Sequence, residues 1–154
     1  MSSPVQEAST LEELIAIRRQ HLENFRQAGI NPWGQRYHRS RLADSIHQEF
    51  AELQADQEGP VVSVAGRVTA YRSHGKATFI DITDVSGRIQ CYFRQNDLGE
   101  ESYKLLENVD VGDFLGIGGK VFRTKRGEIS IAVAEWVPLS KSLRPPPEKW
   151  HGLK

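Results

Sequence analysis

Apolar and polar residues alternate along residues 76–94, a pattern that predicts two β-strands joined by a turn at Ser86-Gly87. Successive side chains of a strand point to opposite faces, so the alternation assigns each residue to one face of this hairpin. Phe79 falls on the polar face, beside Gln90 and Tyr92 of the second strand. The opposite, core face is supplied by Ile80, Ile82, Ile89 and Cys91.

Three more strands are expected on either side of this hairpin. Residues 61–72 form a long apolar run with Gly66 at its middle, where a strongly bent strand places a glycine or a bulge. Residues 113–124 and 127–137 predict a second hairpin, and the glycines at 116–119 are interpreted as strand bending. In the last strand the core face is Ile129, Ile131 and Val133, while Glu128 and Ser130 face outward.

Helical spacing appears in three places. Thr10 and Glu13 have the spacing of a capping box, followed by a helix that ends at Gly29 and Pro32. A second helix is expected before the break at residues 56–60, and one short helix within residues 97–109. The apolar positions that define these helices are Leu11, Leu14, Ile15, Leu22 and Phe25; Leu42, Ile46, Phe50 and Leu53; and Tyr103, Leu106 and Val109.

Five strands with a helix between the third and fourth predict a mainly β protein with helices, built on a five-stranded Greek-key barrel, the OB-fold. We expect residues 1–59 to form an N-terminal helical arm and residues 60–139 to form the barrel. Residues 140–154 are expected to be a Pro-rich linker without a core of its own, leading to a further domain.

Composition limits the class of protein. The chain has 154 residues, 38% of them hydrophobic, which suits one domain or one small domain with an appendage. No apolar run approaches the ~20 residues of a membrane helix, and the first ten residues lack a secretory pattern. The single Cys91 excludes an internal disulfide and fits a reducing compartment.

The net charge is zero, but the charges are segregated along the chain. Residues 18–41 carry +5, residues 42–59 carry −5, and the remainder to the C-terminus carries +3. The first of these segments, which includes Arg19 and Arg26, is a candidate site for nucleic-acid phosphates. Charge alone somewhat favours the alternative, in which these arginines form a solvated helix face that pairs with the acidic helix after it.

The sequence contains no catalytic constellation. The histidines (His21, His38, His47, His74 and His151) do not pair at metal-ligand spacing with each other or with Cys91, and no phosphate loop is present. We therefore expect the chain to bind a partner rather than to catalyse, without a metal or cofactor of its own. An aromatic ring among amides and cations on a sheet surface is typical of sites that stack unpaired bases. If a helix or loop covered Phe79, the ring would instead belong to a second core.

Three stretches resemble one known family: residues 75–93 (GKATFIDITDVSGRIQCYF), 124–131 (TKRGEISI) and 143–153 (LRPPPEKWHGL). They are similar to the N-terminal anticodon-binding domain of class II lysyl-tRNA synthetases, and the resemblance covers nearly the whole chain. Aspartyl and asparaginyl synthetases carry a related barrel, so the 124–130 turn and the linker motif point to the lysine enzyme. Pro146 and Trp150 depart mildly from the family pattern, away from the expected RNA face.

The resemblance implies that Arg72, Phe79, Gln90 and Glu128 contact the anticodon loop of a lysine tRNA, with Tyr92 on the same face. Lysine anticodons have a central uracil, whose pairing edge presents acceptor, donor and acceptor. Gln or Arg can donate to its carbonyls, and a carboxylate can accept its ring N–H. Two alternatives stay open: Glu128 as the partner of Lys125 or Arg126, and Arg72 as a solvated strand end.

The resemblance further implies a longer parent protein. A catalytic domain would begin just after Lys154, and its ATP-binding signatures, F-R-x-E and G-x-G-x-x-R, are absent from this sequence. The parent would charge tRNA with lysine using ATP and Mg²⁺, as a cytoplasmic homodimer. Two other functions compete: a general single-strand-binding barrel without sequence preference, or the anticodon domain of a related aspartyl or asparaginyl synthetase. The helical arm could also serve mainly as a protein-interaction surface.

Overall fold

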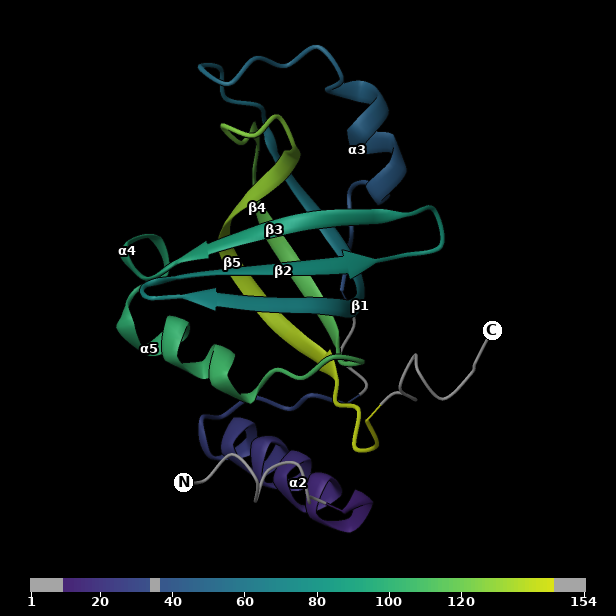
Figure 1. The fold of residues 1–154 in the computed structure, drawn as a ribbon, viewed down its shortest axis with the longest axis vertical. Helices are drawn as coiled ribbons and strands as arrows, with labels where there is room; N and C mark the ends of the chain where they lie inside the picture. Colours follow the sequence, from purple (N-terminus) through teal and green to yellow (C-terminus); the bar gives the residue numbers. More distant parts are fainter. Residues whose placement is uncertain (1–9, 34–36, 146–154) are drawn as a thin grey trace.

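The computed structural model of the chain describes residues 10–33 and 37–145. Five strands form a closed barrel in the order β1-β2-β3-β5-β4 (Figure 1). Antiparallel pairs make up most of the barrel, and a short parallel pairing of β3 with β5 closes it. The OB-fold prediction is therefore confirmed. The strands are β1 Val61–His74, β2 Ala77–Thr83, β3 Arg88–Arg94, β4 Phe114–Arg123 and β5 Ile129–Ser140.

The interior of the barrel follows the predicted alternation. Ile80, Ile82, Ile89 and Cys91 are at most 1% exposed, and the core face predicted for β5 is buried as well. Burial in this apolar interior raises the pKa of the Cys91 thiol, so the group stays protonated. The thiol is a core group, as a lone cysteine on the apolar side of a strand is expected to be.

Bending of the strands occurs close to the predicted positions. The register of β1 against β2 shifts between Val68 and Ala70, just after Gly66. Gly66 itself is needed for close packing, because a Cβ there would lie 2.8 Å from the carbonyl oxygen of Thr83. Gly119 has the same role in β4, where a Cβ would lie 2.1 Å from the carbonyl oxygen of Ala132. A second register shift falls between Gly118 and Gly119, as expected for a bent glycine-rich strand.

Two of the expected helices differ from their predictions. The second, α3, spans only Ala43–Glu49, and Phe50 continues into turns rather than helix. The guanidinium of Arg123 donates to the carbonyls of Ala51 and Leu53, which replaces the helical bonds that those carbonyls would otherwise receive. The single helix expected within 97–109 is three short pieces, because Gly99 takes φ +90° between the first two. They are α4 Gln95–Leu98, α5 Glu100–Lys104 and the 3₁₀ turn η1 Leu105–Asn108.

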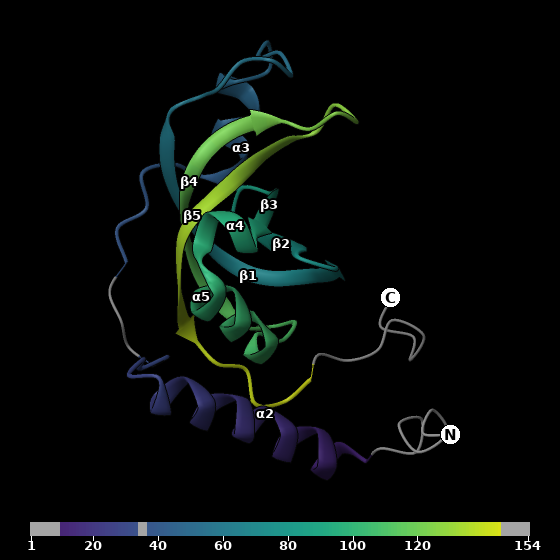
Figure 2. The same ribbon diagram turned by 90° about the vertical axis from the view of Figure 1, so that its left-hand side faces the viewer.

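The first helix, α2 (Leu11–Gln27), begins with the predicted capping box. The Thr10 hydroxyl accepts from the Glu13 amide at 3.1 Å, and the Glu13 carboxylate accepts from the Thr10 amide at 2.9 Å. Figure 2 shows α2 running across the lower end of the barrel. Phe25 anchors it there, fully buried with its ring edge-on to Trp136. No helix among the described residues is long and apolar enough to span a membrane.

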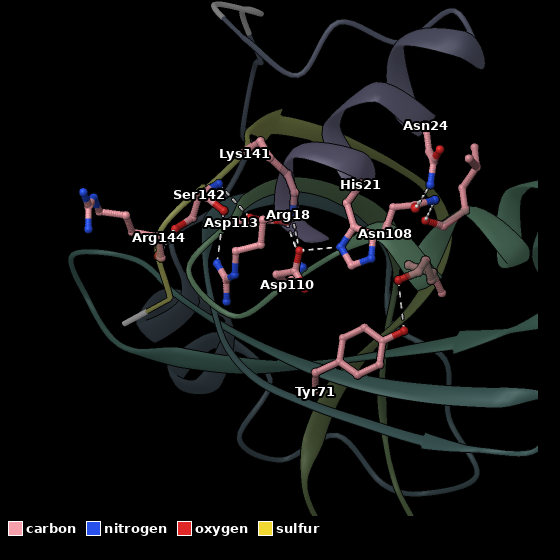
Figure 3. A network of polar contacts seen from close by, with 12 residues as sticks. Arg18, His21, Asn24, Tyr71, Asn108, Asp110, Asp113, Lys141, Ser142 and Arg144 are labelled. Carbon is pink, nitrogen blue, oxygen red and sulfur yellow. Dashed lines mark hydrogen bonds and ion pairs between the residues drawn. The ribbon is translucent and has the colours of Figure 1, made fainter. Parts of the chain in front are cut away.

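Beneath the barrel, a polar network joins α2, the loop before β4 and the chain after β5 (Figure 3). The side chain of Lys141 is 0% exposed and forms ion pairs with Asp110 and Asp113. His21 contacts the same Asp110 carboxylate at 2.7 Å. Burial opposes ionisation of Asp110, but the hydrogen bonds from His21 and Lys141 outweigh it and lower the pKa of the carboxyl.

The same network holds the chain just after residue 139, where the expected linker begins, against the barrel. The strand β5 extends to Ser140, and Lys141 is buried under the barrel. The amide of Ser142 donates to Asp113 at 2.8 Å, and its carbonyl accepts from Arg18 at 3.1 Å. The Pro-rich part of the expected linker, residues 146–154, lies outside the described residues.

Candidate nucleic-acid interface

Aromatic rings from neighbouring strands lie together on the outer side of the barrel. Phe79 and Tyr92 are cross-strand partners, and their rings stack with centroids 4.7 Å apart and planes 26° apart. Phe122 of β4 lies 6.0 Å from Tyr92, and His74 lies 6.5 Å from Phe79. Phe79 and Tyr92 are both partly exposed, so Phe79 is not buried in a second core. The face therefore offers flat apolar surface that solvent can reach.

The strand register brings the predicted site residues next to these rings. Arg72 of β1 pairs with Phe79, which pairs in turn with Tyr92 of β3. Gln90 lies two residues before Tyr92 on the same face. It pairs with Ser130 of β5, and Glu128 is the residue just before that strand. Elements far apart in sequence thus place cationic, amide, aromatic and carboxylate groups on one face.

The amide of Gln90 is held by a hydrogen bond. The Ser130 hydroxyl donates to Gln90 Oε1 at 2.9 Å, which directs the amide nitrogen away from this contact. Ser130 was expected to face outward, but it is fully buried beneath this hydrogen bond. The described residues offer no acceptor to Gln90 Nε2, so this nitrogen is free to donate to a ligand.

Two charged residues that the sequence analysis did not select complete the face. Arg88 contacts Asp81 Oδ2 at 3.1 Å and Glu128 Oε2 at 3.3 Å. The partner of Glu128 is therefore Arg88 of β3, and not Lys125 or Arg126 of its own turn. Arg72 approaches Asp81 as well, at 3.8 Å, and its side chain is 46% exposed. The alternation of side chains along each strand could have identified Asp81 and Arg88. Asp81 shares a face with Phe79, and Arg88 shares a face with Gln90.

The basic segment of residues 18–41 is spread over several environments. Arg18 is 8% exposed within the network beneath the barrel, and Arg41 pairs with Glu49 at 2.9 Å. Arg19 and Arg26 are exposed on α2, where Arg26 approaches Glu23 only at 4.0 Å. In Figure 1, β1 and α5 lie between α2 and the strands β2 and β3. Arg19 and Arg26 therefore lie on a basic surface of α2 that is separate from the aromatic face of the barrel.

Residues 10–33 and 37–145 contain no group of three or more His, Cys, Asp or Glu side chains that could hold a metal ion. The ion pairs on and under the barrel include Arg88 with Glu128 on the aromatic face and Lys141 with Asp113 beneath it. Stacking surface, hydrogen-bond donors and one accessible carboxylate suit the recognition of a planar polar ligand such as a base.

Comparison with known proteins gives consistent results. The tRNA anti-codon family model, described as an OB-fold nucleic acid binding domain, matches residues 62–139. A lysine–tRNA ligase of Syntrophomonas wolfei subsp. wolfei (strain DSM 2245B / Goettingen) is 50% identical over 144 residues, which cover 94% of this chain and 28% of the relative. The lysine–tRNA ligase of Carboxydothermus hydrogenoformans (strain ATCC BAA-161 / DSM 6008 / Z-2901) is 46% identical over 147 residues, which cover 96% of this chain and 29% of the relative. The lysine–tRNA ligase of Moorella thermoacetica (strain ATCC 39073 / JCM 9320) is 47% identical over 142 residues, which cover 92% of this chain and 28% of the relative. The chain therefore spans less than a third of the length of these curated relatives.

Proposed function

The chain belongs to the tRNA anti-codon family of OB-fold nucleic acid binding domains, and from this premise we propose that it recognises the anticodon loop of a lysine tRNA. The face formed by Arg72, Phe79, Gln90, Tyr92 and Glu128 is the proposed reading surface. Arg19 and Arg26 of α2 are proposed to hold phosphates elsewhere on the same tRNA. The similarity to lysine–tRNA ligases supports lysine over the aspartate and asparagine alternatives.

One observation carries this proposal: a partly exposed aromatic stack lies beside a free amide donor and a carboxylate. A base that stacks on Phe79 would bring its pairing edge toward Gln90 and Glu128. Uracil presents a ring N–H between two carbonyls, which matches a carboxylate acceptor flanked by amide and guanidinium donors. Cytosine carries a lone pair at the same ring position, so the carboxylate would repel it.

The test of base selection is Glu128→Gln. We expect the preference for a uracil-centred loop over a cytosine-centred loop to fall by about 1–3 kcal/mol, the usual worth of a good base-edge contact. The new amide can donate to the cytosine ring nitrogen, so the loss comes partly from better cytosine binding. Fluorescence anisotropy with two stem-loops that differ at this base measures it.

Glu135→Gln is the matched control, because Glu135 is an exposed carboxylate of β5, the strand that Glu128 precedes, and its side chain lies against Gly118. It should leave the preference as in wild type. A general single-strand-binding barrel predicts equal binding of the two loops by wild type, and no change with Glu128→Gln. That result would favour the competing function.

The phosphate role of α2 has a separate test. Arg19→Ala and Arg26→Ala should each weaken binding of all tRNAs alike and lower the salt slope by about 1, because each removes one phosphate contact. Arg41→Ala is the control, since its charge is already paired with Glu49. Binding of whole tRNA is measured across a salt series. Unchanged slopes for both variants would favour a protein-interaction role for α2.

We propose that the chain is one part of a longer lysine–tRNA ligase, because it covers less than a third of its relatives. In this organisation residues 1–59 are a helical arm, 60–139 the barrel and 140–154 a linker to the catalytic part. ATP and Mg²⁺ would be bound by that other part, and the parent would be a cytoplasmic homodimer. Sedimentation of the full-length protein, and lysine charging with and without Mg²⁺, test these proposals.

A further inference from the structure

A buried carboxylate lies under the proposed reading surface. The side chain of Asp81 is 10% exposed, and it is flanked by Arg88 at 3.1 Å and Arg72 at 3.8 Å. Its Oδ1 atom is shielded from solvent and has no hydrogen-bond partner. Arg72 Nη2 faces this Oδ1 only at 3.8 Å, beyond hydrogen-bond distance, and a buried carboxylate oxygen without a hydrogen bond costs stability. Asp81 is better explained by what it holds in place.

Arg88 is the group that Asp81 holds most closely. Its guanidinium directs Nη1 to Asp81 and Nη2 to Glu128, so one rigid, planar fork spans β2, β3 and the start of β5. The Glu128 contact uses only Oε2. Glu128 Oε1 has no partner among residues 10–33 and 37–145 and remains free to accept from a ligand.

We propose that Arg88, anchored by Asp81, is a positioning residue for base selection: it fixes the Glu128 carboxylate so that a pyrimidine with a ring N–H is accepted and one with a ring lone pair is rejected. This inference rests on the proposed function, and it deepens it by assigning selectivity to a residue that need not touch the base. A glutamate side chain has several rotatable bonds, and an unrestrained one can turn away from a mismatched base. The contact with the Arg88 guanidinium prevents this rotation of the Glu128 side chain. It also lowers the entropy cost of ordering Glu128 when a ligand binds.

The test is Arg88→Gln in the 154-residue chain, measured with uracil-centred and cytosine-centred stem-loops. We expect the ratio of the two dissociation constants to fall roughly tenfold, within the range that one base-edge contact contributes. Arg88→Lys keeps the charge but not the planar fork, so it should lose most of the same ratio. A phosphate-binding arginine would instead lower both affinities equally and leave the ratio as it was.

Arg94→Gln is the matched control. Arg94 is on the same strand and equally half-exposed, and it lies over the Tyr92 ring at 5.9 Å, but its carboxylate partner is Asp97 at 3.0 Å and not Glu128. Its loss should leave the ratio unchanged. Asp81→Asn offers an independent route, because it weakens the anchor while Arg88 and Glu128 remain, and it should lower the ratio in the same direction. Thermal melts of each variant confirm that the barrel is folded.

The possible results distinguish a failure of the positioning role of Arg88 from a failure of the proposed anticodon recognition. If wild type shows no preference between the loops, the proposed function fails. If wild type prefers uracil, and folded Arg88→Gln or Arg88→Lys keeps that preference in full, the positioning role is overturned while the function stands. If Arg88→Gln does not fold, Arg88→Lys and Asp81→Asn decide the matter, and an undiminished ratio in both rejects the proposal.

Discussion

Replacing Lys141 with alanine is expected to lower the free energy of unfolding by about 3–5 kcal/mol, the usual cost of removing one partner of a buried ion pair. The side chain of Lys141 is 0% exposed, and its ammonium is the shared partner of Asp110 and Asp113. Without it, two carboxylates beneath the barrel would face each other in a site from which water is largely excluded. Urea denaturation at neutral pH, followed by circular dichroism, measures the change.

Lys120→Ala is the control for this substitution. Lys120 pairs with Glu58 at 3.1 Å, but its side chain is 53% exposed and that of Glu58 is 75% exposed. Exposed pairs contribute about 0–1 kcal/mol, so the control should unfold almost as wild type does. A loss for Lys141→Ala as small as that of the control would mean that water enters the site and screens the two carboxylates.

The Lys141 network could not be predicted from the sequence. Its members come from α2, from the loop between η1 and β4, and from the chain just after β5, as Figure 3 shows. Periodicity reports which face of an element is apolar, but it carries no information on which distant polar groups meet beneath a barrel. The sequence pattern therefore predicts that the barrel ends before Lys141, and the prolines that follow suggest that Lys141 belongs to a linker.

The hairpin of β2 and β3 was predictable for the opposite reason. Its register is set by one short turn, so the alternation of side chains assigns Phe79, Gln90 and Tyr92 to one face without further information. The contact of Arg88 with Glu128 depends on the parallel pairing of β3 and β5, which closes the barrel. Long-range pairing of this kind is set by topology, and a local pattern does not report it.

The lengths of two helices differ from those predicted, because backbone conformation and tertiary contacts outweigh the helical spacing of apolar residues. The apolar spacing of residues 97–109 fits a helix, but Gly99 breaks it with a positive φ of +90°. Phe50 and Leu53 continue the stripe of α3, yet both pack against the core from turns after the helix ends at Glu49. The first error concerns the continuity of a helix and the second its end, but Tyr103, Leu106, Val109, Phe50 and Leu53 still pack in or against the core.

Replacing Phe79 with alanine is expected to weaken binding of a lysine anticodon stem-loop by about 1–3 kcal/mol, the usual contribution of one base–aromatic stack. The ring is partly exposed and is backed by Tyr92 at 4.7 Å, so it is already oriented to receive a base on its open side. Alanine removes this surface and leaves Gln90 and Glu128 without a platform that aligns the base edge. Isothermal titration at fixed salt measures the loss.

The control has to separate lost stacking from a disturbed barrel. Phe114→Ala removes an aromatic ring that is 38% exposed at the start of β4, where Arg67 lies over it at 5.1 Å. It should bind the stem-loop as wild type does, whereas Phe79→Leu, which keeps apolar bulk but not the flat ring, should still lose most of the affinity. Equal binding by Phe79→Ala and wild type would mean that no base rests on this ring. The reading surface would then have to be sought elsewhere on the barrel, and the pairing of Arg88 with Glu128 would lose its proposed ligand.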